Sequence, residues 1–282
     1  MSLLLALQLL TAAVPSWVGY GPAELAPEIV QAQQEPAFTK RFLQISQHFL
    51  GAPYLFSPLG EATGADNDPL FTTKQFDCLS LVEVSLALSS TASMDVALQR
   101  LKQLRYLGET VHYTERKHFM ESQWVPENIR LGWITDITRQ IGGASTIRVS
   151  KTMSPALYAK RKKLTELELP DALVPTGTFT WDAIPLDKIM DHAHKIPNGT
   201  ILFVVRVDYQ NVPYRITHTG IVFQRGNTTY LRHAKDSGAH MVVDMPLEAV
   251  VKRHGEFVKW PVTGFSLYLP QQPPAKKVIS AR

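Results

Sequence analysis

One cysteine and two histidines carry most of the chemistry that this sequence can offer. Cys78 is the sole cysteine among 282 residues, so it can form neither an internal disulfide nor a multi-cysteine metal site. It follows Asp77 at the point where a polar turn meets an apolar run that predicts a helix. The N–H groups and partial positive charge of a helix N-terminus favour the thiolate, which attacks carbonyl groups. The alternative is a buried cysteine acting as a small apolar side chain.

The two histidines, His218 and His233, lie in β-branched, apolar segments that we expect to be consecutive strands, 217–224 and 228–233. The Gln-Arg-Gly-Asn sequence at 224–227 has the composition of a hairpin turn. Neighbouring strands lie about 4.8 Å apart, so side chains on one face can touch. A cysteine nucleophile needs a base, and the base needs a third group to orient it. The spacing could therefore bring a nucleophile, a base and an orienting group together.

Other readings of these residues stay open at this point. An isolated histidine on a strand is more often a hydrogen-bonded structural residue than a catalyst. Three imidazoles, those of His218, His233 and His240, could also ligate zinc, although no His-Glu-x-x-His or paired-cysteine motif supports a metal. Gly142-Gly143 lacks the lysine of a phosphate-binding loop, and basic residues are not interleaved with aromatic ones. We therefore expect no cofactor, no metal and no nucleic-acid partner.

The elements that must position these residues are helices first and strands later, which indicates an α+β fold. The helical periodicity and the strand-like composition fall in separate parts of the chain. Residues 19–36 look like a linker or loosely packed arm, and residues 147–183 show little periodicity. The expected helices span 38–50, 78–90 and 94–107, and the further strands span 200–207, 241–244 and 264–269.

Composition sets broad limits on the class of protein. With 45% hydrophobic and 19% charged residues and a net charge of +4, the chain is globular. The basic run 160–163 is expected to be a solvated face, with weak attraction to an anionic polymer as the alternative. The apolar stretch 3–14 has the length of a signal-peptide core, but no lysine or arginine precedes Lys40. This apolar stretch predicts either an altered secretion signal or an N-terminal helix packed on the domain. It is too short to span a bilayer, so we expect no stable membrane insertion.

Four motifs in order make the sequence resemble a known superfamily. They are Gly51-Ala52-Pro53-Tyr54, Phe76-Asp77-Cys78-Leu79-Ser80-Leu81-Val82-Glu83, His218-Thr219-Gly220-Ile221-Val222 and His233-Ala234. Together they resemble the NlpC-type superfamily of papain-like cell-wall hydrolases, and most closely its N-acetylmuramoyl-L-alanine amidase-like branch. The resemblance covers roughly residues 38–269. It implies a papain-like fold with N-terminal helices packed on an antiparallel sheet.

The resemblance also implies a domain organisation. A possible signal or N-terminal arm would span 1–36, a single catalytic domain would span 37–270, and a C-terminal tail would span 271–282. Insertions would fall at 57–73 and 111–183. The loop 57–73 and the segment 113–143 are the natural walls of a specificity cleft.

The resemblance assigns roles residue by residue. Cys78 would be the nucleophile, His218 the general base and His233 the polar third member. Three residues would contact the substrate, namely the cleft-lining Tyr54, the carboxylate Asp77 that precedes the nucleophile, and Ser80. Leu79 is larger than the residue usual after the nucleophile, and Ser80 stands where threonine is common, so both put the substrate fit in doubt.

Three functions follow from the resemblance. The first is hydrolysis of the amide between N-acetylmuramic acid and L-alanine in peptidoglycan fragments (muropeptides), where Trp124 and Trp133 would either stack on the sugar or lie in the core. The second is an endopeptidase that cuts the γ-D-glutamyl to diamino-acid bond, in which Asp77 would hold the free amine of a stem peptide. The third is an inactive module that binds peptidoglycan or a partner protein. A hydrolase of this kind is expected to be bacterial and periplasmic or secreted.

Overall fold

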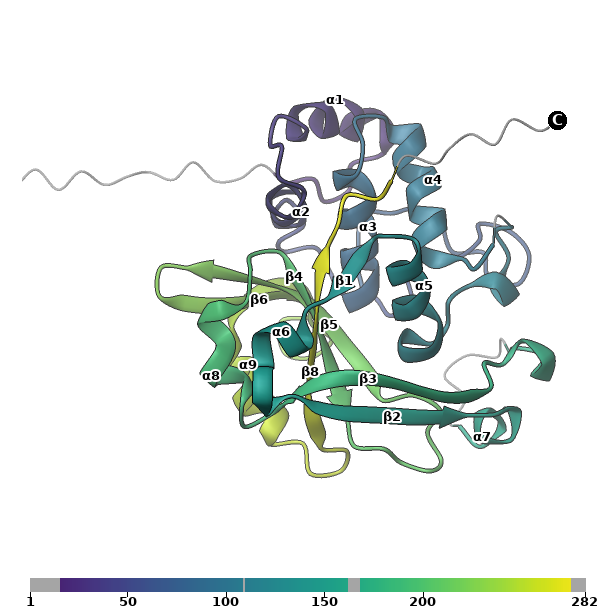
Figure 1. Cartoon of the computed structure of the whole chain (residues 1–282). Coiled ribbons are helices and arrows are strands. Elements are labelled where there is room, and N and C mark those ends of the chain that lie inside the picture. The colour runs from purple at the N-terminus through teal and green to yellow at the C-terminus, as the bar shows by residue number, and fades with distance from the viewer. Residues whose placement is uncertain (1–15, 109, 162–167, 275–282) are drawn as a thin grey trace, which may run out of the picture.

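The computed structural model describes residues 16–108, 110–161 and 168–274. In Figure 1 a group of helices lies on one side of a twisted sheet. Within the described ranges this helical group comprises α1 (Pro22–Ala32), α2 (Phe38–Gln47), α3 (Cys78–Ser89), α4 (Met94–Arg105) and α5 (Val125–Arg130). The predicted helices at 38–50, 78–90 and 94–107 are therefore confirmed as α2, α3 and α4. A π-helical turn, Met120–Trp124, leads into α5.

In the described part of the chain the sheet has eight strands in the order β2-β3-β8-β4-β5-β6-β7, with β1 added beside β8. All of the pairings are antiparallel. The strands are β1 (Ile134–Asp136), β2 (Ile147–Met153), β3 (Gly177–Pro185), β4 (Thr200–Arg206), β5 (Ile216–Arg225), β6 (Thr228–Ala234), β7 (Val242–Pro246) and β8 (Val262–Pro270). The predicted α+β class, with helices and an antiparallel sheet, is confirmed.

Strand β4 shows why the sheet is buried on both faces. Its alternate residues Ile201, Phe203 and Val205 join the core under the helices. Leu202 and Val204 join a second core on the opposite face. That second face is covered by short helices, among them α6 (Thr138–Gly142), α8 (Ile189–His192) and α9 (Leu247–Gly255). The continuous apolar run of β4 is therefore the pattern of a central strand, as predicted.

Helix α3 lies at the centre of the molecule. It packs against α2, α4 and β5 (Figure 1), and all of its residues from Ser80 to Ser89 are buried. A helix that is apolar around its whole circumference must be surrounded in this way. The N-terminus of α3, with Cys78, consequently meets the sheet at β5.

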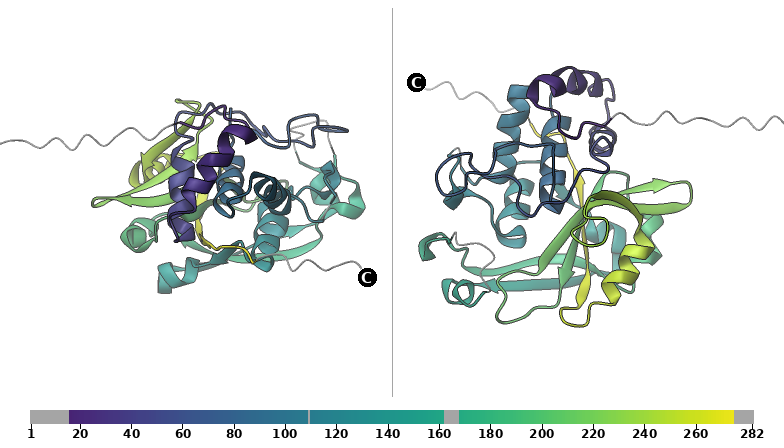
Figure 2. Two further views of the ribbon diagram at one scale, coloured as in Figure 1. Left: turned by 90° about the horizontal axis from the view of Figure 1, so that it is seen from above. Right: turned by 180° about the vertical axis from the view of Figure 1, so that it is seen from behind.

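Two parts of the chain differ from the sequence-based expectation. The segment 19–36, predicted as a linker, forms α1, whose Leu25 and Ile29 are fully buried. Pro22 stands at the first helical position, where proline is compatible with a helix, and α1 also continues through Pro27. The Pro- and Gly-rich composition therefore misled the prediction. Figure 2 shows α1 seated on the helical group from two further directions.

The segment 147–183, which shows little periodicity, contains β2 and β3 in an antiparallel pair. On β2 the buried positions alternate as Val149, Lys151 and Met153. Lys151 lies on the buried side because its Nζ binds Asp208 Oδ1 at 2.6 Å. A lysine at an inward position hid the alternation in the sequence. Short helical elements complete the list: α7 (Pro155–Ala159) and the 3₁₀ turns Tyr113–Glu115, Gly143–Ser145, Asp171–Leu173 and Ala193–Lys195.

Both ends of the chain lie partly outside the described residues. The apolar stretch 3–14, and with it the two interpretations of the N-terminus, lies outside the described residues. In the predicted tail, Gln271 N donates to Trp133 O at 2.8 Å, and residues 275–282 lie outside the described part. No helix within the described ranges is long and apolar enough to cross a bilayer.

Candidate active site

The position of Cys78, the predicted nucleophile, is fixed by a capping box at the start of α3. Asp77 Oδ1 accepts a hydrogen bond from Ser80 N at 2.7 Å, and Ser80 Oγ accepts one from Asp77 N at 2.9 Å. These reciprocal bonds satisfy two backbone donors that a helix end leaves free. Asp77 Oδ2 also accepts from Ser57 N at 3.1 Å. Cys78 is therefore the first residue of the helix, held by its immediate neighbours.

The two residues of this cap differ in their access to the cleft. Asp77 is half-buried and lines each of the three cavities around the site. Ser80 is 2% exposed, and its hydroxyl is engaged in the cap. The substrate contact that the resemblance implied for Ser80 is therefore not available in this structure, whereas Asp77 stays at the cleft surface.

The two histidines come from β5 and β6 and bind each other. His218 Nε2 and His233 Nδ1 are 2.7 Å apart, and the ring planes are inclined by 72°. Gly220 allows β5 and β6 to lie close together, because a Cβ at this position would lie 2.8 Å from the Arg232 carbonyl oxygen. The predicted hairpin is thus confirmed, and it brings the two imidazoles into contact.

Cys78 and His218 line the same two cavities, one of about 570 Å³ and one of about 280 Å³. His233 and Tyr54 line the smaller of the two. No hydrogen bond joins the Cys78 sulfur to either imidazole in the described structure. Cys78 and His218 are brought together by the two cavities that both residues line. Catalytic hydrogen bonds are often loose in an unliganded site and tighten around a substrate.

The protonation states differ from the expected thiolate. Burial, with the Asp77 carboxylate as the next cause, raises the pKa of Cys78 to about 12. Burial and the neighbouring His233 lower the pKa of His218. Both groups are therefore neutral near pH 7, and the helix N-terminus does not by itself ionise the thiol. A neutral thiol and a neutral imidazole could work as an activated thiol–base pair, in which proton transfer accompanies attack.

The hydrogen bond between the rings determines which nitrogen can act. His218 Nε2 is occupied by His233 Nδ1, so Nδ1 of His218 is the nitrogen left to take a proton from Cys78. In the tautomer that leaves Nδ1 able to accept a proton, His218 carries its own proton on Nε2 and donates it to His233 Nδ1. His233 is protonated on Nε2, a buried atom without a hydrogen-bond partner in the described structure. The bond between the rings is therefore compatible with a neutral His218 whose Nδ1 can accept a proton.

A third imidazole, His254, was not found by sequence analysis. It lies on α9 with its ring centre 6.4 Å from that of His218, and it is 9% exposed. On α9 it continues the buried face of Leu247 and Val250. Burial lowers the pKa of His254 as well. The sequence signal for His254 is a histidine at a core-facing position of a helix, and this signal is weak.

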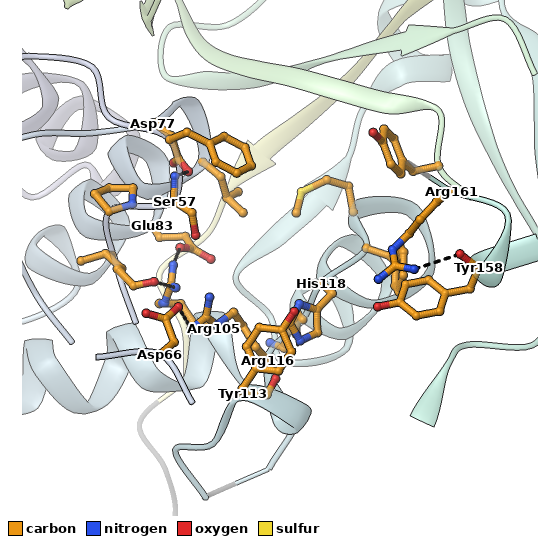
Figure 3. A pocket seen from close by; sticks show the side chains of 18 residues that line it. Ser57, Asp66, Asp77, Glu83, Arg105, Tyr113, Arg116, His118, Tyr158 and Arg161 are labelled. Carbon is orange, nitrogen blue, oxygen red and sulfur yellow. Dashed lines mark hydrogen bonds and ion pairs between the residues drawn. The ribbon is translucent and has the colours of Figure 1, made fainter. Parts of the chain in front are cut away.

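A further cavity of about 260 Å³ extends from Asp77 and Leu79 along the loops predicted to form the cleft walls. Figure 3 shows its charged lining. Arg105 pairs with Glu83 at 2.5 Å, and Arg116 pairs with Asp66 at 2.8 Å. Residues of both predicted wall segments line it, namely Ser57, Pro58, Leu59 and Asp66 from the first and Tyr113, Arg116, Lys117, His118, Phe119 and Met120 from the second.

Two other sequence-based possibilities can be assessed from the geometry. Trp124 and Trp133 are 0% and 1% exposed and belong to the main core, so neither can stack on a sugar in the cleft. His240 is exposed and lies in a turn after β6. In the described part of the chain no group of three His, Cys, Asp or Glu side chains is arranged to hold a metal ion. The basic run 160–163 is described only for Lys160, which is exposed, and Arg161, which packs over the Tyr158 ring at 3.6 Å.

Residues 44–256 match the model of the AmiA-like family, which is described as N-acetylmuramoyl-L-alanine amidase-like. The chain belongs to this family. The matched segment includes Cys78, both histidines of the hairpin, and His254. This places the chain among amidase-like hydrolases related to peptidoglycan breakdown. No curated protein matches it.

Solved structures with low identity share the fold. LPG0564 from Legionella pneumophila, of family DUF1460, has a TM-score of 0.75 at 22% identity, over 88% of this chain and 94% of that one. An N-acetylmuramoyl-L-alanine amidase from Bacteroides uniformis has a TM-score of 0.65 at 21% identity, over 83% of this chain and 99% of that one. The AmiA-like chain therefore has nearly the full fold of both neighbours.

Proposed function

We propose that this AmiA-like protein is a papain-like, NlpC-type cysteine hydrolase that cleaves the N-acetylmuramoyl-L-alanine amide bond of muropeptides. The observation that carries the proposal is the convergence of Cys78, His218 and His233 on one cavity, with the two imidazoles hydrogen-bonded. The family match and the amidase among the similar structures support the choice of bond. A periplasmic or secreted location is part of this proposal, because peptidoglycan lies there.

The proposed reaction has two steps. In the first, His218 Nδ1 takes the thiol proton while the Cys78 sulfur attacks the lactyl carbonyl carbon. The backbone N–H of Cys78 donates to the developing oxyanion. The C–N bond then breaks, and the proton on His218 passes to the alanine nitrogen, which leaves a thioester. In the second step His218 takes a proton from water, the hydroxide oxygen attacks the thioester, and the sulfur leaves and regains the proton.

The larger cavity supports a sugar-bearing substrate. Its volume of about 570 Å³ is in the range of sites that hold small molecules. Aromatic residues provide much of its lining, including Phe56, Tyr214, Phe257 and Trp260. Such side chains present apolar faces together with polar edges, which suits a muramyl group.

The contacts of Asp77 bear on the choice between the amidase and the endopeptidase readings. An endopeptidase of this type would use that carboxylate to hold a free amine. Here each oxygen of Asp77 already accepts a backbone N–H, from Ser80 and from Ser57. A carboxylate committed to a helix cap and a loop is less available to an ammonium group, so this geometry supports the amidase reading.

Product analysis of one defined muropeptide tests the proposal. Purified protein is incubated with a disaccharide tetrapeptide, and the products are identified by mass spectrometry. The amidase reading predicts free disaccharide and an intact stem peptide. A dipeptide that remains attached to the sugar would support the endopeptidase, and binding without any product would support an inactive module.

A further inference from the structure

Arg206 is held at the edge of the cleft by neutral groups. It is the last residue of β4, and it lines both cavities that contain Cys78 and His218. Its Nε donates to Thr217 Oγ1 at 3.0 Å, and its Nη1 donates to the Trp260 carbonyl oxygen. The guanidinium lies over the Phe257 ring, 4.7 Å from its centre. These contacts fix the position and the plane of the guanidinium.

The charge of Arg206 has no counterion in the described structure. No carboxylate lies within ion-pair distance of it, although Asp77 and Asp236 line the same smaller cavity. The arginines of the neighbouring cavity contrast with it, since Arg105 and Arg116 are both paired with carboxylates (Figure 3). Burial lowers the pKa of Arg206, and no acidic group opposes the effect. A half-buried guanidinium without an anion is energetically unfavourable, and an anionic ligand would relieve it.

The free edge of Arg206 is available to a ligand. Nη2 makes no hydrogen bond to the described protein, and it is not among the buried atoms that lack a partner. The side chain as a whole is half-buried. Arg206 also lies near His218, because its Nε binds Thr217, the residue before His218, and both residues line the same two cavities. A ligand bound at Nη2 would therefore lie near the reacting groups.

We propose that Arg206 binds a carboxylate of the stem peptide, the carboxylate on the D-glutamyl residue that follows alanine. This inference rests on the proposed function. In a muropeptide the N-acetylated sugars are uncharged, so the carboxylates belong to the peptide. The D-glutamyl carboxylate is the first of these after the scissile amide, within about two residues of extended chain. A guanidinium edge matches a carboxylate in shape and charge and holds it through charge-assisted hydrogen bonds.

A matched pair of ligands tests the proposal. They are N-acetylmuramoyl-L-alanyl-D-glutamate and its amide, N-acetylmuramoyl-L-alanyl-D-isoglutamine, which differ at this one carboxylate. Binding is measured by calorimetry in the Cys78→Ala background, so that neither ligand is consumed. We expect the acid to bind about 10- to 100-fold more tightly than the amide, as for a hydrogen bond to a charged group.

Variants of Arg206 test whether this side chain causes the tighter binding of the acid than of the amide. Arg206→Gln should bring the acid-to-amide ratio close to one, and Arg206→Lys should retain part of it. Arg225→Gln is the matched control, because Arg225 is 58% exposed and pairs with Asp244 away from the cleft; it should keep the full ratio. A purely structural role for Arg206 would weaken both ligands equally.

Two results would overturn the inference. One is equal affinity for the acid and the amide in the Cys78→Ala protein, and the other is an unchanged ratio in Arg206→Gln. Failure of the proposed function is recognised separately, because it would appear as the absence of amide hydrolysis by the wild-type protein in the product analysis.

Discussion

The two sides of the cleft around Cys78 are built by different kinds of contact. On the helix side, Asp77 and Ser80 hold the start of α3 through hydrogen bonds between residues three apart. On the sheet side, His218 and His233 depend on strand pairing, burial and their bond to each other. Local sequence thus fixes where Cys78 lies, whereas tertiary packing sets the protonation state of His218.

Removal of the sulfur should have the largest effect on this arrangement. Cys78→Ala deletes the proposed nucleophile, and we expect kcat/KM on a muropeptide to fall by about 10⁴-fold or more. The capping box does not use the thiol, so the thermal unfolding midpoint should stay close to that of the wild type. Steady-state kinetics and a thermal melt measure both quantities. Activity within tenfold of the wild type would exclude Cys78 as the nucleophile.

The two histidines should differ in their contributions on the sheet side. His218→Ala removes the proposed general base and should reduce kcat by about 10²- to 10⁴-fold. His233→Gln offers an amide oxygen to accept from His218 Nε2, so it should retain more activity than His233→Ala. All three variants are compared by kcat on the same muropeptide. A smaller loss for His218→Ala than for His233→Ala would mean that the two roles are exchanged.

The helix side was predictable from sequence because its determinants are contiguous. Asp77, Cys78 and Ser80 form a cap that can be recognised within four residues, and the start of α3 is confirmed at Cys78. The hairpin of β5 and β6 could be predicted equally well, since its strands and turn are neighbours in the chain. Both features follow from local propensity and turn chemistry.

The remaining parts of the site depend on contacts between distant residues. Arg206 is proposed as a substrate contact because no counterion pairs with it in the described structure. A missing contact leaves no pattern in the sequence. Lys151 hid β2 because its partner, Asp208, is 57 residues away. The protonation state of Cys78 was expected to follow the helix end, yet burial outweighs that effect. Desolvation depends on everything that surrounds the sulfur, so it cannot be judged from a motif.

Variants of Asp77 can separate two effects on Cys78: the cap that holds its position, and the charge that raises the pKa of its thiol. Its charge raises the pKa of the Cys78 thiol, and Asn would keep an oxygen to accept from Ser80 N. Asp77→Asn should therefore lower the thiol pKa, and alkylation by iodoacetamide near pH 8 should be faster by up to about tenfold, the change for one pKa unit. Asp77→Ala should behave similarly toward the reagent but lose about 1 kcal/mol of stability with the cap. Slower alkylation of Asp77→Asn would contradict this account.

The buried imidazoles should make the sheet side sensitive to acid. The pKa values of His218, His233 and His254 are lowered, first of all by burial, while an unfolded histidine has a pKa of about 6.5. Below that pH the unfolded chain binds protons that the folded protein does not, so the free energy of unfolding decreases as the pH falls. Each histidine should contribute roughly 1 kcal/mol per pH unit.

A variant of His254 isolates the contribution of one histidine to this loss of stability at acidic pH. It lies beside Phe257 and Phe265, and His254→Phe keeps an aromatic ring there without a titrating group. Urea unfolding at pH 7.5 and pH 5.0 should show a smaller loss of stability for His254→Phe than for the wild type. Carboxylates that titrate in the same range affect both proteins alike, so the difference between the two losses reports His254. An identical loss would mean that this imidazole is protonated in the folded protein as readily as in the unfolded chain.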